Sequence, residues 1–239
     1  MKKMSKVGAI VVCIGVSLTS GCNTTSPQLG GLGGSKTSGS AAGKLSTSSI
    51  QSKLDASIVE VGVARKKLLG AQLKMLEALG KKEAADAIVS GSNVLREGGV
   101  VTPANESEIE ESVKVSRQLN AELEKFNDET VKLNEEQKAI FTEAKSDFRD
   151  GLLLEAGQVA VLVLVAKEAK ENLEGVKKNP LKAPKAAALS GAAAKMASWI
   201  PGDVKAMHGT WTVMRKVGAD NEIEMDDIDI DSHLSGPGN

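Results

Sequence analysis

The sequence predicts an all-α protein, a helical bundle or long helical hairpin on a flexible N-terminal tether. Apolar residues recur at helical spacing from about Ser48 to Asp220. Helix-start signals precede some of these stretches, as at Thr102. Residues 23–47 consist mainly of Gly, Ser, Thr and Ala. We therefore expect four parts, with the ranges 1–21, 22–47, 48–220 and 221–239.

The first 22 residues have the layout of an export signal. Three lysines precede an uncharged apolar run at 7–18, which is short of the roughly 20 residues that a spanning helix needs. Two small residues then precede Cys22. This layout resembles the signal of bacterial lipoproteins, which is cleaved before a cysteine that is then acylated. The resemblance implies a signal peptide at 1–21 and a lipid, such as palmitate, on Cys22. Thr19 departs from the family pattern, which prefers leucine at that place.

Two alternatives stay open: ordinary secretion after cleavage near Ser20 or Gly21, and an uncleaved anchor. Cys13 lies in the apolar run, so cleavage before Cys22 leaves the mature domain without a thiol for a disulfide, a metal site or covalent catalysis. Asn23 follows the cysteine. In Gram-negative lipoproteins this resemblance implies the outer membrane, with the body facing the periplasm.

Residues 23–47 are predicted to be a flexible linker. They carry too few apolar side chains to offset the entropy of ordering the chain. A flexible chain of about 25 residues spans roughly 25–30 Å. The helical body is therefore expected to stand off the membrane.

Helices are expected in order along the body. A capping box at 48–51 predicts a first helix that reaches Leu79. A short second helix, closed by glycines at 98–99, is predicted from the spacing of three apolar residues: Ala84, Ile88 and Leu95.

A long helix is expected over 103–149, as one arm of a coiled-coil-like hairpin. Thr102 is the predicted cap, Pro103 suits the first helical position, and glutamates follow near the positive end of the helix dipole. Asp150-Gly151 is expected to interrupt or kink this helix.

The segment 152–166 is apolar nearly all round and has two interpretations. The preferred one is the central helix of a bundle, covered on all sides. The other is a membrane-active segment that is concealed until it inserts. About 15 residues are few for spanning a bilayer, and Glu155 would be costly there.

Small residues dominate 183–199, and Pro201-Gly202 is expected to end that helix. Asp203 is the predicted cap of a last helix, and Trp199 and Trp211 are expected to pack these two helices together. From Asp220 onward the chain is acidic and then rich in Gly and Pro, which predicts a disordered tail.

Composition argues against several function classes. The net charge is −1, and the body lacks the basic patch that nucleic-acid binding needs. His208 and His233 are the only histidines and have no second ligand at metal-binding spacing. The acidic run at 227–231 lacks the turn glycine of an EF-hand loop, since Ser232 stands there. We expect no enzyme, no metal and no cofactor.

The sequence thus predicts an exported, membrane-anchored lipoprotein with a structural or adaptor role in the cell envelope. It would bind an envelope protein through helix faces. The alternative is a membrane-perturbing helical protein that uses 152–166. Cys22 is the one site residue that the sequence predicts.

Overall fold

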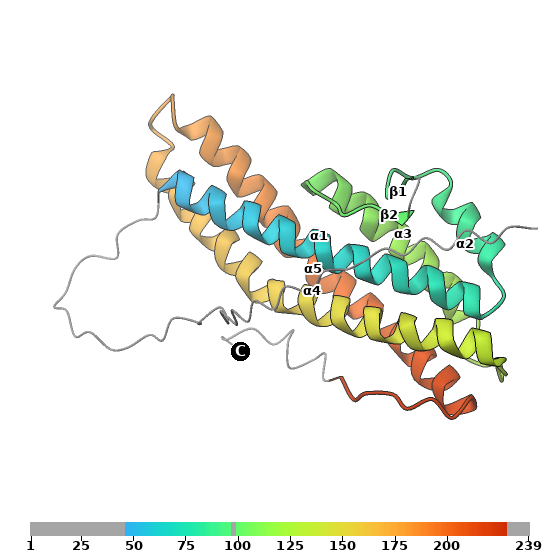
Figure 1. Ribbon diagram of the computed structural model, residues 1–239. Helices are drawn as coiled ribbons and strands as arrows, with labels where there is room; N and C mark the ends of the chain where they lie inside the picture. Colours follow the sequence, from blue (N-terminus) through green and yellow to red (C-terminus); the bar gives the residue numbers. More distant parts are fainter. Residues whose placement is uncertain (1–45, 97–98, 229–239) are drawn as a thin grey trace, which may run out of the picture. The chain divides into compact units, whose positions relative to one another are not determined.

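The structure, a computed structural model, describes residues 46–96 and 99–228, which belong to one compact unit (Figure 1). Within these residues the fold is all-α, as expected. The elements are α1 (Thr47–Ala78), α2 (Lys82–Val89), β1 (Leu95–Arg96), β2 (Gly99–Val100), α3 (Glu106–Glu124), α4 (Glu135–Val176) and α5 (Ala183–Asp220). The expected signal peptide, Cys22 and nearly all of the linker lie outside the described residues.

The helices α1 and α4 form an antiparallel pair, and α5 packs along α4 (Figure 1). Ion pairs join α1 to α4 at Lys53 with Glu168 and at Lys67 with Asp150. The hydroxyl of Ser46 caps α1 by accepting a hydrogen bond from the Ser49 amide. The helix therefore begins slightly before the expected capping box.

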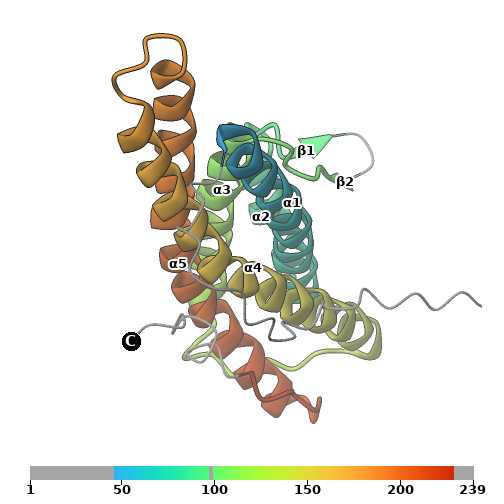
Figure 2. The same ribbon diagram turned by 90° about the vertical axis from the view of Figure 1, so that its left-hand side faces the viewer.

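The bundle has two sections, because α3 covers only part of its length (Figures 1 and 2). Polar contacts join α3 to α5 at Lys195 and Ala206, and to α1 at Arg65 and Gln72. We call this end, with α1, α3, α4 and α5, the four-helix section. At the other end only α1, α4 and α5 remain, and we call it the three-helix section.

The expected long helix at 103–149 is two helices, so that prediction was wrong. α3 ends at Glu124, and α4 begins after a capping box in which Asn134 and Gln137 bond each other's backbone amides. The chain between them supplies Phe126 and Leu133 to the core. The cap of α3 is Asn105 rather than Thr102, and it accepts a hydrogen bond from the Glu108 amide.

Two expected helix breaks are absent from the described chain. α4 continues through Asp150-Gly151, where the glycine lets α1 approach: a Cβ there would lie 2.9 Å from Leu68 Cγ. α5 continues through Pro201 because the buried residues Ile200 and Val204 keep its core face continuous across the proline.

The second helix is shorter than expected. It ends at Val89, and Leu95 lies in a two-stranded antiparallel hairpin instead, paired with Val100. Gly99, the first residue of β2, has a φ of 113°, a conformation that favours glycine. The glycine that was expected to close a helix therefore lies in a hairpin.

The tail prediction was wrong for residues 221–228, which pack on the bundle. The Asn221 side chain accepts a hydrogen bond from the Leu133 amide and donates to the Val131 carbonyl, each at 2.8 Å. Ile223 and Met225 pack against the core. Residues 229–239 lie outside the described part of the chain.

The two tryptophans differ in environment. Trp211 is buried and stacks on Phe148 of α4, with ring centroids 6.2 Å apart. Trp199 is half-buried beneath the Lys195 ammonium. Both lie on the single helix α5, so they do not join two final helices as predicted.

Candidate functional site

The segment 152–166 is only half covered, which corrects the prediction of a helix covered on all sides. α4 packs mainly on α1 and α5, so the face of this segment that points away from both helices has no neighbouring helix in the described chain. The buried members are Leu152, Ala156, Val159, Leu162 and Val165. The exposed large apolar members are Leu153, Leu154, Val161, Val163 and Leu164.

Some of these exposed residues form a line along α4. Leu154, Gly157, Val161 and Leu164 follow one another at steps of three or four, the spacing of one helix face. The same spacing continues to Asp150 at one end and to Glu168 at the other. Both carboxylates pair with lysines of α1. The apolar line therefore borders α1 between two ion pairs.

The facing edge of α1 has the same periodicity. Between the paired lysines Lys53 and Lys67, the positions at steps of three or four are Ala56, Glu60 and Val63, all exposed. Glu60 forms no ion pair with any described residue. We call these three residues, together with Leu154, Gly157, Val161 and Leu164, the α1–α4 seam.

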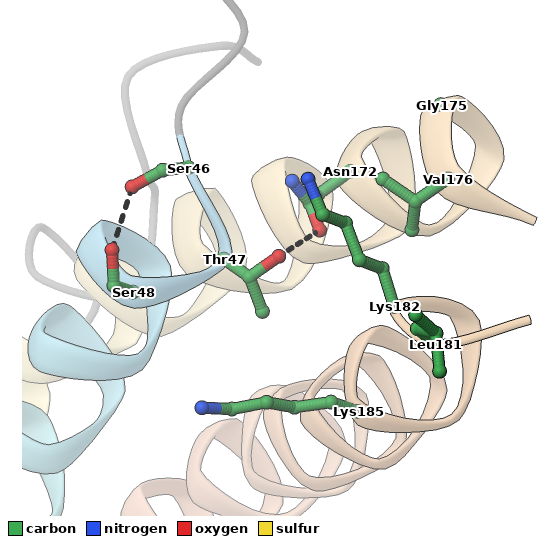
Figure 3. Close-up of a pocket in the computed structure, with 9 residues that line it drawn as sticks. All are labelled: Ser46, Thr47, Ser48, Asn172, Gly175, Val176, Leu181, Lys182 and Lys185. Carbon is green, nitrogen blue, oxygen red and sulfur yellow. Dashed lines mark hydrogen bonds between the residues drawn. The ribbon is translucent and has the colours of Figure 1, made fainter. Parts of the chain in front are cut away.

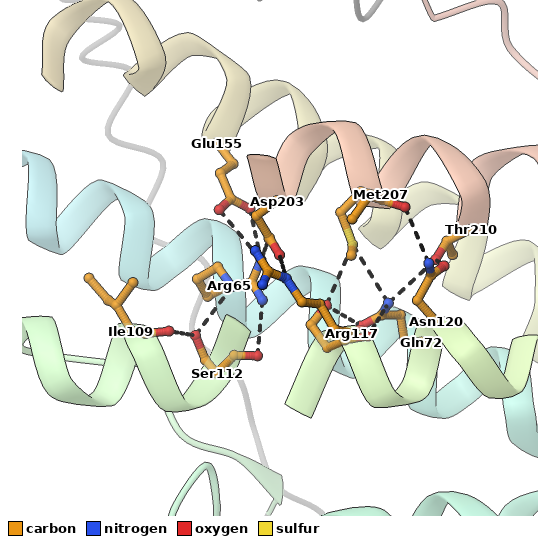
Figure 4. A network of polar contacts seen from close by, with 12 residues as sticks. Arg65, Gln72, Ile109, Ser112, Arg117, Asn120, Glu155, Asp203, Met207 and Thr210 are labelled. Atoms are coloured by element: carbon orange, nitrogen blue, oxygen red, sulfur yellow. Dashed lines mark hydrogen bonds and ion pairs between the residues drawn. The ribbon is translucent and has the colours of Figure 1, made fainter. Parts of the chain in front are cut away.

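Beneath the seam, a network of buried charges joins four helices (Figure 4). Arg65 of α1 is fully buried and donates to both carboxylates that face it, Glu155 of α4 at 3.2 Å and Asp203 of α5. Its remaining nitrogens donate to the hydroxyl and carbonyl of Ser112 on α3. Arg117 lies 3.7 Å from the second oxygen of Asp203.

A second buried polar layer lies one to two turns further along. Gln72 donates to the Ser116 carbonyl at 3.2 Å and to the Thr210 hydroxyl at 3.4 Å. Asn120 binds Thr210 and the Ala206 carbonyl (Figure 4). Buried hydrogen bonds of this kind fix the register of neighbouring helices, because a shift would leave buried groups unpaired.

Burial raises the pKa of Glu155 from 4.5 to about 7; Arg65 opposes this and Asp203 adds to it. For Arg65, burial lowers the pKa, but the two carboxylates outweigh it, so the arginine stays charged. From the sequence, Asp203 was expected to cap a helix, and Glu155 was considered only as a cost in a bilayer. The sequence feature that could have indicated this network is the presence of charged residues within apolar stretches.

A groove of about 490 Å³ lies at the end of the three-helix section (Figure 3). The start of α1, the end of α4 and the start of α5 meet there. Its lining residues are Ser46, Thr47, Ser48, Asn172, Gly175, Val176, Leu181, Lys182 and Lys185. The Thr47 hydroxyl donates to the Asn172 side chain at 3.0 Å, which ties α1 to α4 at this end.

Cys22, the predicted site residue, lies outside the described residues. Over 46–96 and 99–228, no cluster of three or more His, Cys, Asp or Glu side chains is arranged to hold a metal. None of the helices described is both long and apolar enough to span a bilayer. Comparisons of the chain with protein-family models, curated proteins and solved structures find no match.

Proposed function

We propose that the protein is an exported, lipid-anchored adaptor of the cell envelope, and that its α1–α4 seam binds an amphipathic helix of a partner protein. The observation that carries this proposal is the apolar outer face of α4 at the seam. A face that only met water would gain nothing from Leu154, Val161 and Leu164, which are all exposed.

The shape of the seam suits a helix. From Leu154 to Leu164 it extends about 15 Å, roughly three turns, at a rise of about 1.5 Å per residue. Gly157 and Ala56 lie within it, and small residues let a second helix approach closely. Glu60, which has no ion-pair partner among the described residues, would pair with a Lys or Arg of the partner helix.

The charges around the seam favour a protein over a bilayer. Its ends carry the ion pairs Lys53 with Glu168 and Lys67 with Asp150, and Glu60 lies between them. Amphipathic helices that lie on membranes usually carry a basic polar face, which this mixed rim does not resemble. The membrane-perturbing function is therefore the second candidate, and leakage of liposomes is its measurement.

The test uses two residues that differ in position but not in exposure. Leu164 lies in the seam and Val163 lies outside it, and each is 52% exposed. A photo-crosslinking side chain placed at Leu164 should capture one specific envelope protein in intact cells, through a helical segment. The same group at Val163 should not. Equal capture at both positions, or capture of lipid alone, would refute the adaptor proposal.

The anchor is tested separately. We expect Cys22→Ser to abolish labelling by a fatty-acid probe and to release the protein from the membrane fraction or stall its processing. Unchanged labelling would remove the lipoprotein part of the proposal. The seam would still be tested by the crosslinking pair.

A further inference from the structure

The loop between α4 and α5 forms a basic tip with one apolar side chain at its end. Residues 177–185 contain four exposed lysines and no carboxylate. Leu181 lies among them and is 90% exposed, the most exposed of the large apolar residues described. We call residues 177–185 the basic tip.

Most of this charge is uncompensated. Lys177 pairs with Glu174 at 2.9 Å, whereas Lys178, Lys182 and Lys185 form no ion pair within the described chain. Lys182 and Lys185 line the end groove beside the hydroxyl-rich residues 46–48 at the start of α1 (Figure 3). The tip therefore combines positive charge, hydroxyl groups and one protruding leucine.

The chain enters the helical body at this same end. Ser46 precedes α1 directly, and Thr47 is held to Asn172 beside the tip. A lipid on Cys22 would thus be joined to the tip side of the body by the residues that precede Ser46. Tethering to a membrane anchor would raise the effective concentration of the tip at the bilayer surface.

We infer that the basic tip contacts an anionic lipid surface, with its lysines on the headgroup phosphates and Leu181 in the interface. Clustered lysines are attracted to anionic headgroups, and each adds to the attraction within a Debye length. Leucine gains from leaving water at the same place. The inference rests on the lipid anchor of the proposed function. It departs from the sequence-based expectation that the body stands off the membrane, and it orients the seam to run away from the membrane.

The test is amine labelling of the full lipidated chain in vesicles, read by mass spectrometry at each lysine. In vesicles with phosphatidylglycerol, Lys178, Lys182 and Lys185 should label at least threefold more slowly than in pure phosphatidylcholine. Lys82 and Lys125, exposed and at the opposite end of the bundle, should label equally in both. Leu181→Asp should remove most of the protection.

Several outcomes would overturn the inference. They are equal labelling in the two kinds of vesicle, equal protection at Lys82, and the same protection by inorganic phosphate without vesicles, which would indicate a free-anion site.

Vesicle binding separates the two proposals. If the wild type and Cys22→Ser associate equally, the anchor proposal fails. If the chain is anchored but the tip lysines are unprotected, the tip inference fails alone.

Discussion

α4 has the same kind of core face in both sections of the bundle but two different outer faces. In the four-helix section, Phe141 and Phe148 point to the core, and the outer residues Glu143 and Asp147 pair with Lys74 of α1. In the three-helix section the core face is again apolar, but so is the outer face around Val161. The exposed apolar residues around Val161 thus stand where the other section of the same helix carries paired charges.

The first prediction concerns the buried face. Leu162 is fully buried, so Leu162→Asp would lose about 2–5 kcal/mol of core packing and enclose an unpaired carboxylate. We expect the largest loss of the free energy of unfolding here, enough to unfold a domain of ordinary stability. Chemical denaturation followed by circular dichroism measures it. A folded Leu162→Asp variant would show that this face is loosely held.

The second prediction concerns the junction of the sections. Arg65→Met would leave Glu155 and Asp203 buried without their partner, and breaking such an arrangement costs about 3–5 kcal/mol. Adding Asp203→Asn should recover part of the loss. Arg117→Met is the control, since this arginine is half exposed and should matter far less. Equal losses for the two arginines would contradict a central role for Arg65.

The third prediction concerns the end of the four-helix section. Asn221 bonds the backbone of Leu133, Val131 and Val217, so Asn221→Ala would leave buried backbone groups unpaired. We expect the free energy of unfolding to fall by about 1–3 kcal/mol. Glu222→Ala, an exposed neighbour, should change the melting temperature little. An unchanged melting temperature for Asn221→Ala would restore the interpretation of residues 221–228 as an unpacked tail.

The fourth prediction uses pH. Because the pKa of Glu155 is raised from 4.5 to about 7, the folded protein holds a proton there that the unfolded chain has lost. This residue therefore makes the free energy of unfolding fall as pH rises from about 4.5 to about 7, and adds no further change above that. We expect Glu155→Gln to make the free energy of unfolding less dependent on pH in this range, as measured by chemical denaturation at several pH values. An unchanged pH dependence would show that Glu155 is already ionised through its contact with Arg65.

Apolar spacing was enough to predict an all-α body, because helical periodicity is set by the chain itself. The break between α3 and α4 was missed although the Asn134 and Gln137 capping pair is visible in the sequence. The Pro201 and Gly151 breaks were predicted from local preference, which tertiary packing overrides. The pairing of Arg65 with Glu155 and Asp203 joins residues far apart in the chain, and no local pattern could predict it.

The burial of the segment 152–166 could not be predicted from local sequence patterns either. Its composition predicts burial on all sides, but which face lacks a neighbour depends on how α4 packs against α1 and α5, which are distant in the sequence. The α1–α4 seam could therefore be identified only from the structure.

The most direct test compares two aspartates on this one segment. Leu164→Asp places a charge at a position that is 52% exposed, so we expect a loss in the free energy of unfolding below about 1 kcal/mol. In a pull-down from the native envelope, we expect this folded variant to retain none of the partner identified by crosslinking, while Val163→Asp retains it fully. If Leu164→Asp is folded and still retains the partner as well as the wild type does, the seam is not the binding surface and the central claim is wrong.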